Sequence, residues 1–265
     1  SDERDVNKSY ACSYAIIGDA KLVLRQMIEE VNRQVSGKPR DGTAVQAEIK
    51  ELKENLLKEY MSVLVSNDTP INPYRIYWDL MHTLDRENSF VTHESGNTRD
   101  QTSTIYEAII PHGYMGWGNV STLGFGLGAS VGAKLAFPAR QVVCIAGDAG
   151  VAYHLGNYEM LVRHRFGITI IHINNSAFAG YGPGFWGPGH DPYTWAVTPS
   201  TVMNMAKVAE AMGMYAERVE RPDEVTPAIK RALNANSSGE PAYIEIIASQ
   251  YPVYGNWVTA GRATH

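Results

Sequence analysis

Two oxygen-bearing side chains, 27 positions apart, each come after an apolar segment of the chain. Asp148 lies in the sequence Gly-Asp-Ala-Gly at 147–150, after the apolar residues 142–146, and Asn175 follows the apolar residues 168–173. Because the carboxyl ends of parallel strands meet at one edge of an open α/β sheet, both side chains would face the same ligand-binding crevice. Carboxylate and amide oxygens are suitable ligands for a Mg²⁺ ion bound to phosphate groups. The spacing therefore predicts a metal and phosphate site.

Each of these features also has an ordinary structural interpretation. Asp148 could cap the helix expected after it, and Asn174–Asn175 could form a turn. The glycines over 124–132 could serve only the close packing of a helix on the sheet.

Three of the histidines also have an ordinary structural interpretation. His172, in the middle of the apolar segment 168–173, indicates a core position. His154 and His164 stand at the two ends of the helix expected over 154–164, where surface positions are the simpler interpretation.

Strand-like and helix-like patterns alternate through most of the chain. The expected strands are 89–92, 142–146, 168–173, 215–219 and 242–247, and the expected helices are 75–84, 124–135, 154–164, 201–212 and 222–234. This alternation predicts an α/β fold, a doubly wound parallel sheet with helices on both faces. Residues 94–98 indicate a polar turn. The loop 176–198 is rich in Gly, Pro and aromatic residues, which favours a pocket wall or lid over a dimer contact.

The first 70 residues follow a different pattern. Tyr14–Ile17 indicates a short strand and 22–31 an amphipathic helix, which together cannot bury a core. We therefore interpret residues 1–35 as the tail of a preceding central domain. Residues 36–70 are predicted to be a linker and a charged helix, and residues 71–265 the main domain.

Composition and charge exclude several classes of partner. The net charge is −5 without a basic block, so nucleic acid is not an expected partner. No apolar run approaches the ~20 residues of a membrane span. The two cysteines, Cys12 and Cys144, lie far apart, which favours a reduced, cytoplasmic protein over a secreted one.

Four segments, in order along the chain, resemble thiamine-diphosphate-dependent enzymes. Gly147–Gly150 with Asn174–Asn175 resembles the diphosphate-binding signature of that family. Ser121–Lys134 resembles the glycine-rich segment that precedes it in acetolactate synthase and benzoylformate decarboxylase. Glu94–Thr98 resembles a diphosphate-contacting turn, and Ile17–Leu24 resembles the end of the family's central domain. The resemblance implies the thiamine-diphosphate-binding fold, with residues 71–265 as its diphosphate-binding domain.

The resemblance also implies a role for each matching residue. Thiamine diphosphate would bind together with Mg²⁺, whose protein ligands would be Asp148, Asn175 and the backbone carbonyl of Ala177. Leu123 would be the apolar wedge that keeps the cofactor in its V-shaped conformation. The full set of cofactor-binding residues would be Ser95, Gly96, Asn97, Thr98, Leu123, Gly147, Asp148, Ala149, Gly150, Asn175, Ala177 and Phe178. FAD, which many acetolactate synthases carry, would bind mainly outside this chain, so its presence stays open.

The function implied is the diphosphate- and Mg²⁺-binding half of a lyase or carboligase acting on 2-oxo acids, acetolactate-synthase-like in pattern. The segment Glu94–Thr98 (ESGNT) favours an alternative, a 2-hydroxyacyl-CoA lyase or oxalyl-CoA decarboxylase acting on an acyl-CoA. A non-catalytic assembly or regulatory subunit is an alternative of another class.

One expected component of such an enzyme does not occur in these residues. The family activates its cofactor with a glutamate on a pyrimidine-binding domain, whereas Glu94 aligns with the diphosphate side. We therefore expect a partner domain or subunit to supply that glutamate, in a homo- or hetero-oligomer. The chain would be either a fragment of a longer protein or a natural subunit.

Overall fold

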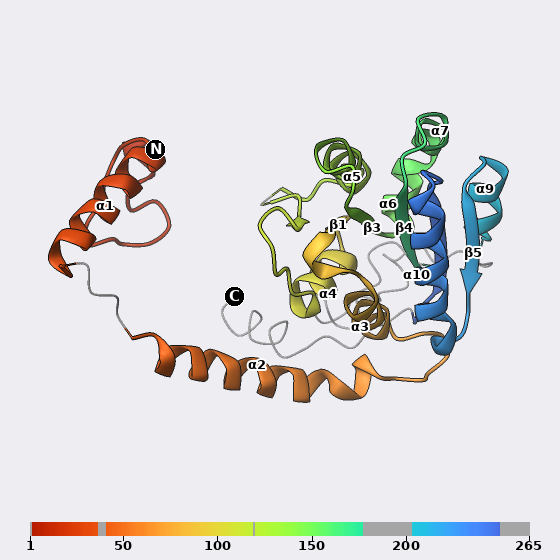
Figure 1. The fold of residues 1–265 in the computed structure, drawn as a ribbon, viewed down its shortest axis with the longest axis horizontal. Helices are drawn as coiled ribbons and strands as arrows, with labels where there is room; N and C mark the ends of the chain where they lie inside the picture. Colours follow the sequence, from red (N-terminus) through yellow and green to blue (C-terminus); the bar gives the residue numbers. More distant parts are fainter. Residues whose placement is uncertain (1, 37–40, 119, 177–202, 250–265) are drawn as a thin grey trace, which may run out of the picture. The chain divides into compact units, whose positions relative to one another are not determined.

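The computed structural model describes residues 2–36, 41–118, 120–176 and 203–249, and Figure 1 shows the order of its elements. Its contacts divide the chain into two compact units, Ser1–Leu57 and Lys58–His265. The domain boundaries predicted after residues 35 and 70 stay predictions. Among the described residues, no helix has the length and apolar composition to span a membrane.

The first unit contains the 3-10 helix η1 (Glu3–Asp5), α1 (Ala20–Gln34) and most of α2 (Thr43–Leu64). α1 begins where the side chain of Asp19 accepts a 3.1 Å hydrogen bond from the amide of Leu22, as expected for an N-cap. The strand predicted over Tyr14–Ile17 is wrong, because these described residues have no regular secondary structure. Within the described part of the unit no second strand pairs with them, and a strand needs such a partner for its backbone hydrogen bonds.

Six parallel strands form one sheet in the second unit, in the order β2-β1-β3-β4-β6-β5. The strands are β1 (Ser89–His93), β2 (Tyr114–Met115), β3 (Gln141–Gly147), β4 (Ile168–Asn174), β5 (Tyr215–Val219) and β6 (Ala242–Ile247). The predicted parallel sheet is confirmed, and β5 and β6 have their predicted bounds. The short edge strand β2 was not predicted.

The strand register brings three strand ends together. His93 pairs with Ile145 between β1 and β3, and Gly147 pairs with Ile173 between β3 and β4. From β1 the chain first adds β2 on one side and then β3 on the other, so the winding direction reverses between β1 and β3. Ligands of open α/β sheets bind at such a reversal, beyond the carboxyl ends of the strands.

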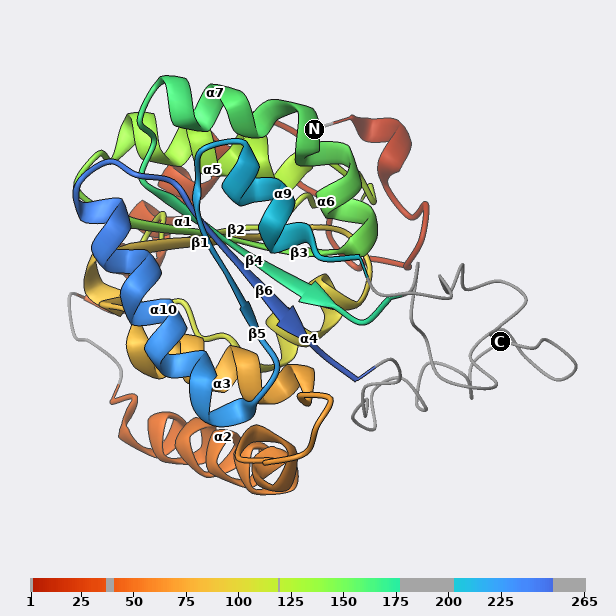
Figure 2. The same ribbon diagram turned by 90° about the vertical axis from the view of Figure 1, so that its right-hand side faces the viewer.

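Helices cover both faces of the sheet, as Figure 2 shows. One face is covered by α5 (Phe125–Ala136), α6 (Asp148–His154), α7 (Tyr158–Arg163) and α9 (Met205–Ala211). The other face is covered by α3 (Pro73–Thr83), α4 (Asn97–Ile105) and α10 (Pro222–Ser237). Two short 3-10 helices, η2 (Arg86–Asn88) and η3 (Leu155–Asn157), complete the described elements.

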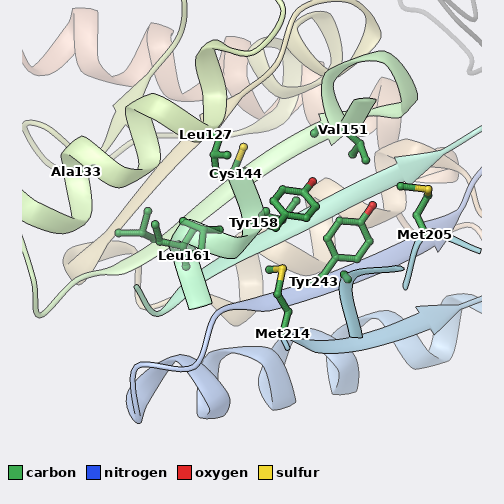
Figure 3. Packing of buried hydrophobic residues seen from close by; sticks show 14 of the residues in the cluster. Leu127, Ala133, Cys144, Val151, Tyr158, Leu161, Met205, Met214 and Tyr243 are labelled. Carbon is green, nitrogen blue, oxygen red and sulfur yellow. The ribbon is translucent and has the colours of Figure 1, made fainter. Parts of the chain in front are cut away.

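The core explains why the central strands are almost continuously apolar. Both faces of β3 and β4 are buried, so successive residues pack alternately against the two helical layers. Figure 3 shows the layer that contains Cys144, Tyr158 and Tyr243. The rings of Tyr158 and Tyr243 lie 5.7 Å apart between their centroids. Large side chains therefore join α7 to β6 across the sheet surface.

Three helical regions differ from the sequence prediction. In the region expected to be helical over 201–212, the described helix α9 begins only at Met205. In place of one helix predicted over 154–164, the structure has three successive helical segments, α6, η3 and α7. The first of them, α6, begins at Asp148. The helix α4 was not predicted, because its polar residues have weak helix propensity. The burial of Thr98, Gln101 and Ile105 against the rest of the unit, rather than intrinsic helix propensity, stabilises α4.

Candidate functional site

A pocket lies beyond the carboxyl ends of β1, β3 and β4, where the sequence analysis placed the metal and phosphate residues. It is lined by Pro73, Ser95, Gly96, Asn97, Thr98, Gln101, Gly147, Asp148, Ala149, Gly150, Ile173 and Asn175. All of these except Pro73, Gln101 and Ile173 belong to the predicted cofactor-binding set. The structure thus brings two segments that are about 50 positions apart, 95–98 and 147–150, to one pocket with Asn175.

Three predicted residues are not in this group. Leu123 is half-buried just before α5 but does not line the pocket, so its role as a wedge stays a prediction. Ala177 and Phe178 lie outside the described residues, as does the loop prediction for 176–198 beyond Ser176.

The β1 side of the pocket depends on an unusual backbone conformation at Gly96. Its φ of 93° and ψ of −148° lie in a region that residues with a side chain rarely adopt. Gly96 is the N-cap of α4, so this conformation turns the chain from β1 into the helix. The hydroxyl of the buried Thr98 donates a 3.0 Å hydrogen bond to the backbone carbonyl of Glu94 and closes the same turn.

Asp148 is the first residue of α6 but not its cap. The N-cap is Gly147, which makes no side-chain capping bond, so the interpretation of Asp148 as an N-cap is not observed. Instead Oδ1 of Asp148 accepts a 3.1 Å hydrogen bond from Nε2 of His172. The Asp148 side chain is 21% exposed, whereas that of His172 is 1% exposed. One end of this contact is therefore in the core and the other in the pocket.

His172 occupies the core position that the sequence indicated, yet it also makes polar contacts on both sides. Its Nδ1 lies 2.8 Å from the hydroxyl of Tyr243 on β6. In the register of the sheet, His172 pairs with Ala146, two residues before Asp148. An ionisable side chain within a largely aliphatic strand was the signal in the sequence, but the contact with Asp148 was missed.

Asn174 and Asn175 have different environments. Asn174 is 3% exposed, donates a 2.7 Å hydrogen bond to Oε1 of the buried Glu245, and accepts one from the amide of Ser176. This local bond is typical of an Asx turn, so the turn interpretation is correct for Asn174. Asn175 lines the pocket. Asn174 thus stabilises the fold, whereas Asn175 contributes to the pocket.

Glu94 lies beneath the pocket, fully buried, and does not line it. Its carboxylate accepts hydrogen bonds from the amides of Gly124 (2.8 Å) and Gly126, and from Nε2 of His154 (2.7 Å). His154 is 1% exposed, so the surface position indicated by the sequence is wrong. The last residue of α6 turns inward because it meets a carboxylate that local sequence does not reveal.

The pKa of Glu94 reflects two opposing effects. Burial raises it, whereas the contact with His154 and the amides of Gly124 and Gly126 lower it. The hydrogen bonds prevail, and the pKa lies below its ordinary value. Glu94 is therefore held as a carboxylate.

Two glycines allow the close approach to Glu94. A Cβ on Gly150 would lie 2.6 Å from Cγ of Glu94, and one on Gly126 would lie 2.7 Å from its Oε1. The packing interpretation is therefore correct for Gly126. At Gly128 and Gly132, by contrast, a Cβ would meet no neighbouring atom of the described residues within 4 Å.

The fold and the pocket together define an α/β protein with a ligand pocket at the switch point of a doubly wound parallel sheet. Residues 94–246 match the family model "Thiamine pyrophosphate enzyme, C-terminal TPP binding domain". The chain belongs to this family, which confirms the resemblance inferred from the four sequence segments.

Curated relatives and a solved structure agree with this family. The chain is 25% identical over 245 residues to a probable acetolactate synthase large subunit of Methanococcus aeolicus, covering 89% of this chain and 40% of that protein. It is 30% identical over 249 residues to a 2-hydroxyacyl-CoA lyase of Oryza sativa subsp. japonica, covering 89% and 41%. The chain thus spans about two fifths of the length of these relatives.

The structural match supports the fold. A thiamine diphosphate-dependent 4-hydroxybenzoylformate decarboxylase of Rhodococcus jostii RHA1 superposes with a TM-score of 0.59 at 24% identity. The match covers 70% of this chain and 34% of that chain.

Proposed function

We propose that this chain provides the diphosphate and Mg²⁺ site of a thiamine-diphosphate-dependent lyase or carboligase that acts on 2-oxo acids, as in acetolactate synthase. The observation that carries the proposal is the meeting of Asp148 and Asn175 in one pocket with the turn at Gly96. These residues come from the ends of three neighbouring strands, where this fold class binds phosphorylated ligands.

The chemistry of the lining residues fits the proposed ligands. Asp148 and Asn175 offer the carboxylate and amide oxygens that Mg²⁺ uses alongside phosphate oxygens. The pocket also contains the first residues of α4, whose N-terminus favours an anion. The conformation at Gly96 and the absence of side chains at Gly96, Gly147 and Gly150 let backbone approach the ligand closely.

In this proposal the residues of the chain bind and orient, while the cofactor supplies the electron sink for carbon–carbon chemistry. Asp148, Asn175 and the carbonyl of Ala177 hold the metal. Residues 95–98 and 147–150 hold the diphosphate from opposite sides. Leu123 would be the apolar residue that supports the cofactor's conformation, and Phe178 would contact the cofactor.

The activating glutamate is proposed to come from a pyrimidine-binding domain or subunit. Glu94 is unsuited to that task, because it is fully buried and its oxygens already accept hydrogen bonds from Gly124, Gly126 and His154. The span of about two fifths of the relatives' length supports a contribution from further protein. A homo- or hetero-oligomer would assemble the complete site.

A 2-hydroxyacyl-CoA lyase is the second candidate. The 30% identity to the rice 2-hydroxyacyl-CoA lyase exceeds the 25% and 26% to two archaeal acetolactate synthase subunits, and it favours an acyl-CoA substrate. A purely regulatory role is less well supported, since such a domain has no physical need for Asp148 and Asn175 in one pocket.

Calorimetric titration with thiamine diphosphate, with and without Mg²⁺, tests the proposal. We expect binding that requires Mg²⁺ and that Asp148→Ala abolishes, whereas Glu159→Ala on the exposed side of α7 leaves it unchanged. An unchanged affinity of Asp148→Ala would rule out the metal assignment. Assays of the complete assembly with pyruvate and with a 2-hydroxyacyl-CoA would then distinguish the two substrate classes.

A further inference from the structure

Three side chains from three elements form a continuous row of hydrogen bonds that ends in the pocket. The hydroxyl of Tyr243 on β6 lies 2.8 Å from Nδ1 of His172 on β4, and Nε2 of His172 lies 3.1 Å from Oδ1 of Asp148 at the start of α6. Tyr243 is fully buried and His172 is 1% exposed. The row therefore begins in the core and reaches solvent only at Asp148.

The chemistry of each group sets the direction of the hydrogen bonds. A carboxylate can only accept, so the ring proton of His172 lies on Nε2. Burial raises the pKa of Tyr243 well above its ordinary value, so its hydroxyl keeps its proton. In the neutral imidazole with its proton on Nε2, Nδ1 can only accept, so it accepts from that hydroxyl. Both bonds thus donate toward Asp148.

The surroundings of this row leave its members little freedom. Tyr243 pairs in register with Ile170, two residues before His172, so both side chains stand on the same face of the sheet. The ring of Tyr243 packs against Tyr158 and His172, with centroids 5.7 and 5.9 Å away. Figure 3 shows the Tyr243 ring within this buried layer. The adjacent buried strands β4 and β6 thus fix the position of the imidazole.

A buried acid on β6 beside His172 is engaged in other contacts. Glu245, which pairs in register with His172, accepts hydrogen bonds from Asn174 (2.7 Å) and from the amide of Ala206 (3.0 Å). Arg218 lies 3.6 Å from the same carboxylate. The row from Tyr243 to Asp148 is therefore separate from this second network.

We infer that His172 is a positioning residue: it donates from Nε2 to Oδ1 of Asp148 and orients the carboxylate for a divalent cation, with Tyr243 selecting its tautomer. This inference rests on the proposed function of Asp148. Removing a side chain that hydrogen-bonds to a metal ligand and orients it typically lowers the metal affinity ten- to a hundredfold.

Three variants of the 265-residue chain separate this role from simple core packing. His172→Val removes both hydrogen bonds and keeps a side chain suited to a strand. His172→Gln keeps an N–H donor close to the position of Nε2. Tyr243→Phe removes only the hydroxyl that the imidazole accepts from.

The first probe is inorganic pyrophosphate, titrated calorimetrically in the presence of Mg²⁺. The second probe is Mn²⁺ in place of Mg²⁺, and its binding is followed by electron paramagnetic resonance. We expect His172→Val to weaken the Mg²⁺-dependent affinity by about tenfold or more. His172→Gln should recover most of this loss, and Tyr243→Phe should weaken binding a few-fold. Rescue by glutamine is not expected of a side chain that only fills space.

A spectroscopic measurement tests the tautomer without any ligand. Long-range ¹H–¹⁵N spectra should show His172 protonated on Nε2, and the Nδ1 resonance should shift in Tyr243→Phe. A proton on Nδ1, or equal affinities for the unaltered chain and His172→Val, would overturn the inference while leaving the proposed function intact. Absence of Mg²⁺-dependent binding in the unaltered chain would overturn both.

Discussion

Nε2 of His154 donates a 2.7 Å hydrogen bond to Oε1 of Glu94, and both side chains are almost completely buried. The same carboxylate accepts hydrogen bonds from the backbone amides of Gly124 and Gly126. Glu94 follows β1, the glycines begin α5, and His154 ends α6. One buried carboxylate thus connects three elements around the base of the pocket.

The first prediction concerns the stability that this carboxylate provides. Glu94→Gln replaces one acceptor oxygen with an NH₂ group that faces a donor. We expect the free energy of unfolding to fall by about 3 kcal/mol, because buried polar groups lose partners. Urea denaturation followed by circular dichroism measures this change. The matched control is Glu159→Gln, whose 60% exposed side chain pairs with Arg163, and whose effect should stay within about 0.5 kcal/mol.

A second prediction follows from the pKa of Glu94, which lies below its ordinary value of 4.5 in the folded protein. A lowered pKa means that the carboxylate stabilises the fold fully above the unfolded value, and that this stability is lost as pH falls through the folded pKa. The stability difference between the unaltered chain and Glu94→Gln should therefore be constant from pH 7 to about 5 and shrink below 4.5. Urea denaturation across this range measures it. A stability difference that stays independent of pH down to about 3 would contradict the conclusion that the lowered pKa of Glu94 stabilises the fold.

The third prediction compares two glycines with opposite requirements. Gly96→Ala places a side chain at φ 93°, which should cost about 1–3 kcal/mol and weaken Mg²⁺-dependent pyrophosphate binding. Gly128→Ala, in the middle of α5, where a Cβ would meet no atom of the described residues within 4 Å, should instead stabilise the chain by about 0.5–1 kcal/mol. Thermal or urea denaturation gives the sign of each change. Equal effects at both positions would mean that the conformation at Gly96 is not a constraint.

The fourth prediction separates two adjacent asparagines. Asn174→Ala leaves Oε1 of the buried Glu245 without the donor it now has, so we expect a loss of about 2–3 kcal/mol in the free energy of unfolding. Asn175→Ala should change stability by less than about 1 kcal/mol, in the range of surface substitutions, but should weaken Mg²⁺-dependent binding. Calorimetry and denaturation of both variants test this division. Similar profiles for the two variants would show that it is wrong.

Much of the fold could be predicted because its signals are local. The strands over 215–219 and 242–247 have their predicted bounds, since short runs with strand-forming residues next to Gly or Pro are recognisable in any short window. The helix α4 could not be predicted, because its polar residues favour a helix only when the sheet and α3 bury one side of it.

The sequence by itself determined that Asp148 and Asn175 follow consecutive parallel strands, and parallel strands carry their ends to one edge of a sheet. Only the tertiary structure decided that Glu94 and His154 meet below the pocket and that His172 joins Tyr243 to Asp148. These partners are 60, 71 and 24 positions apart in the chain. Their contacts depend on which strands become neighbours and in which register, and a local pattern of residue types does not contain that information.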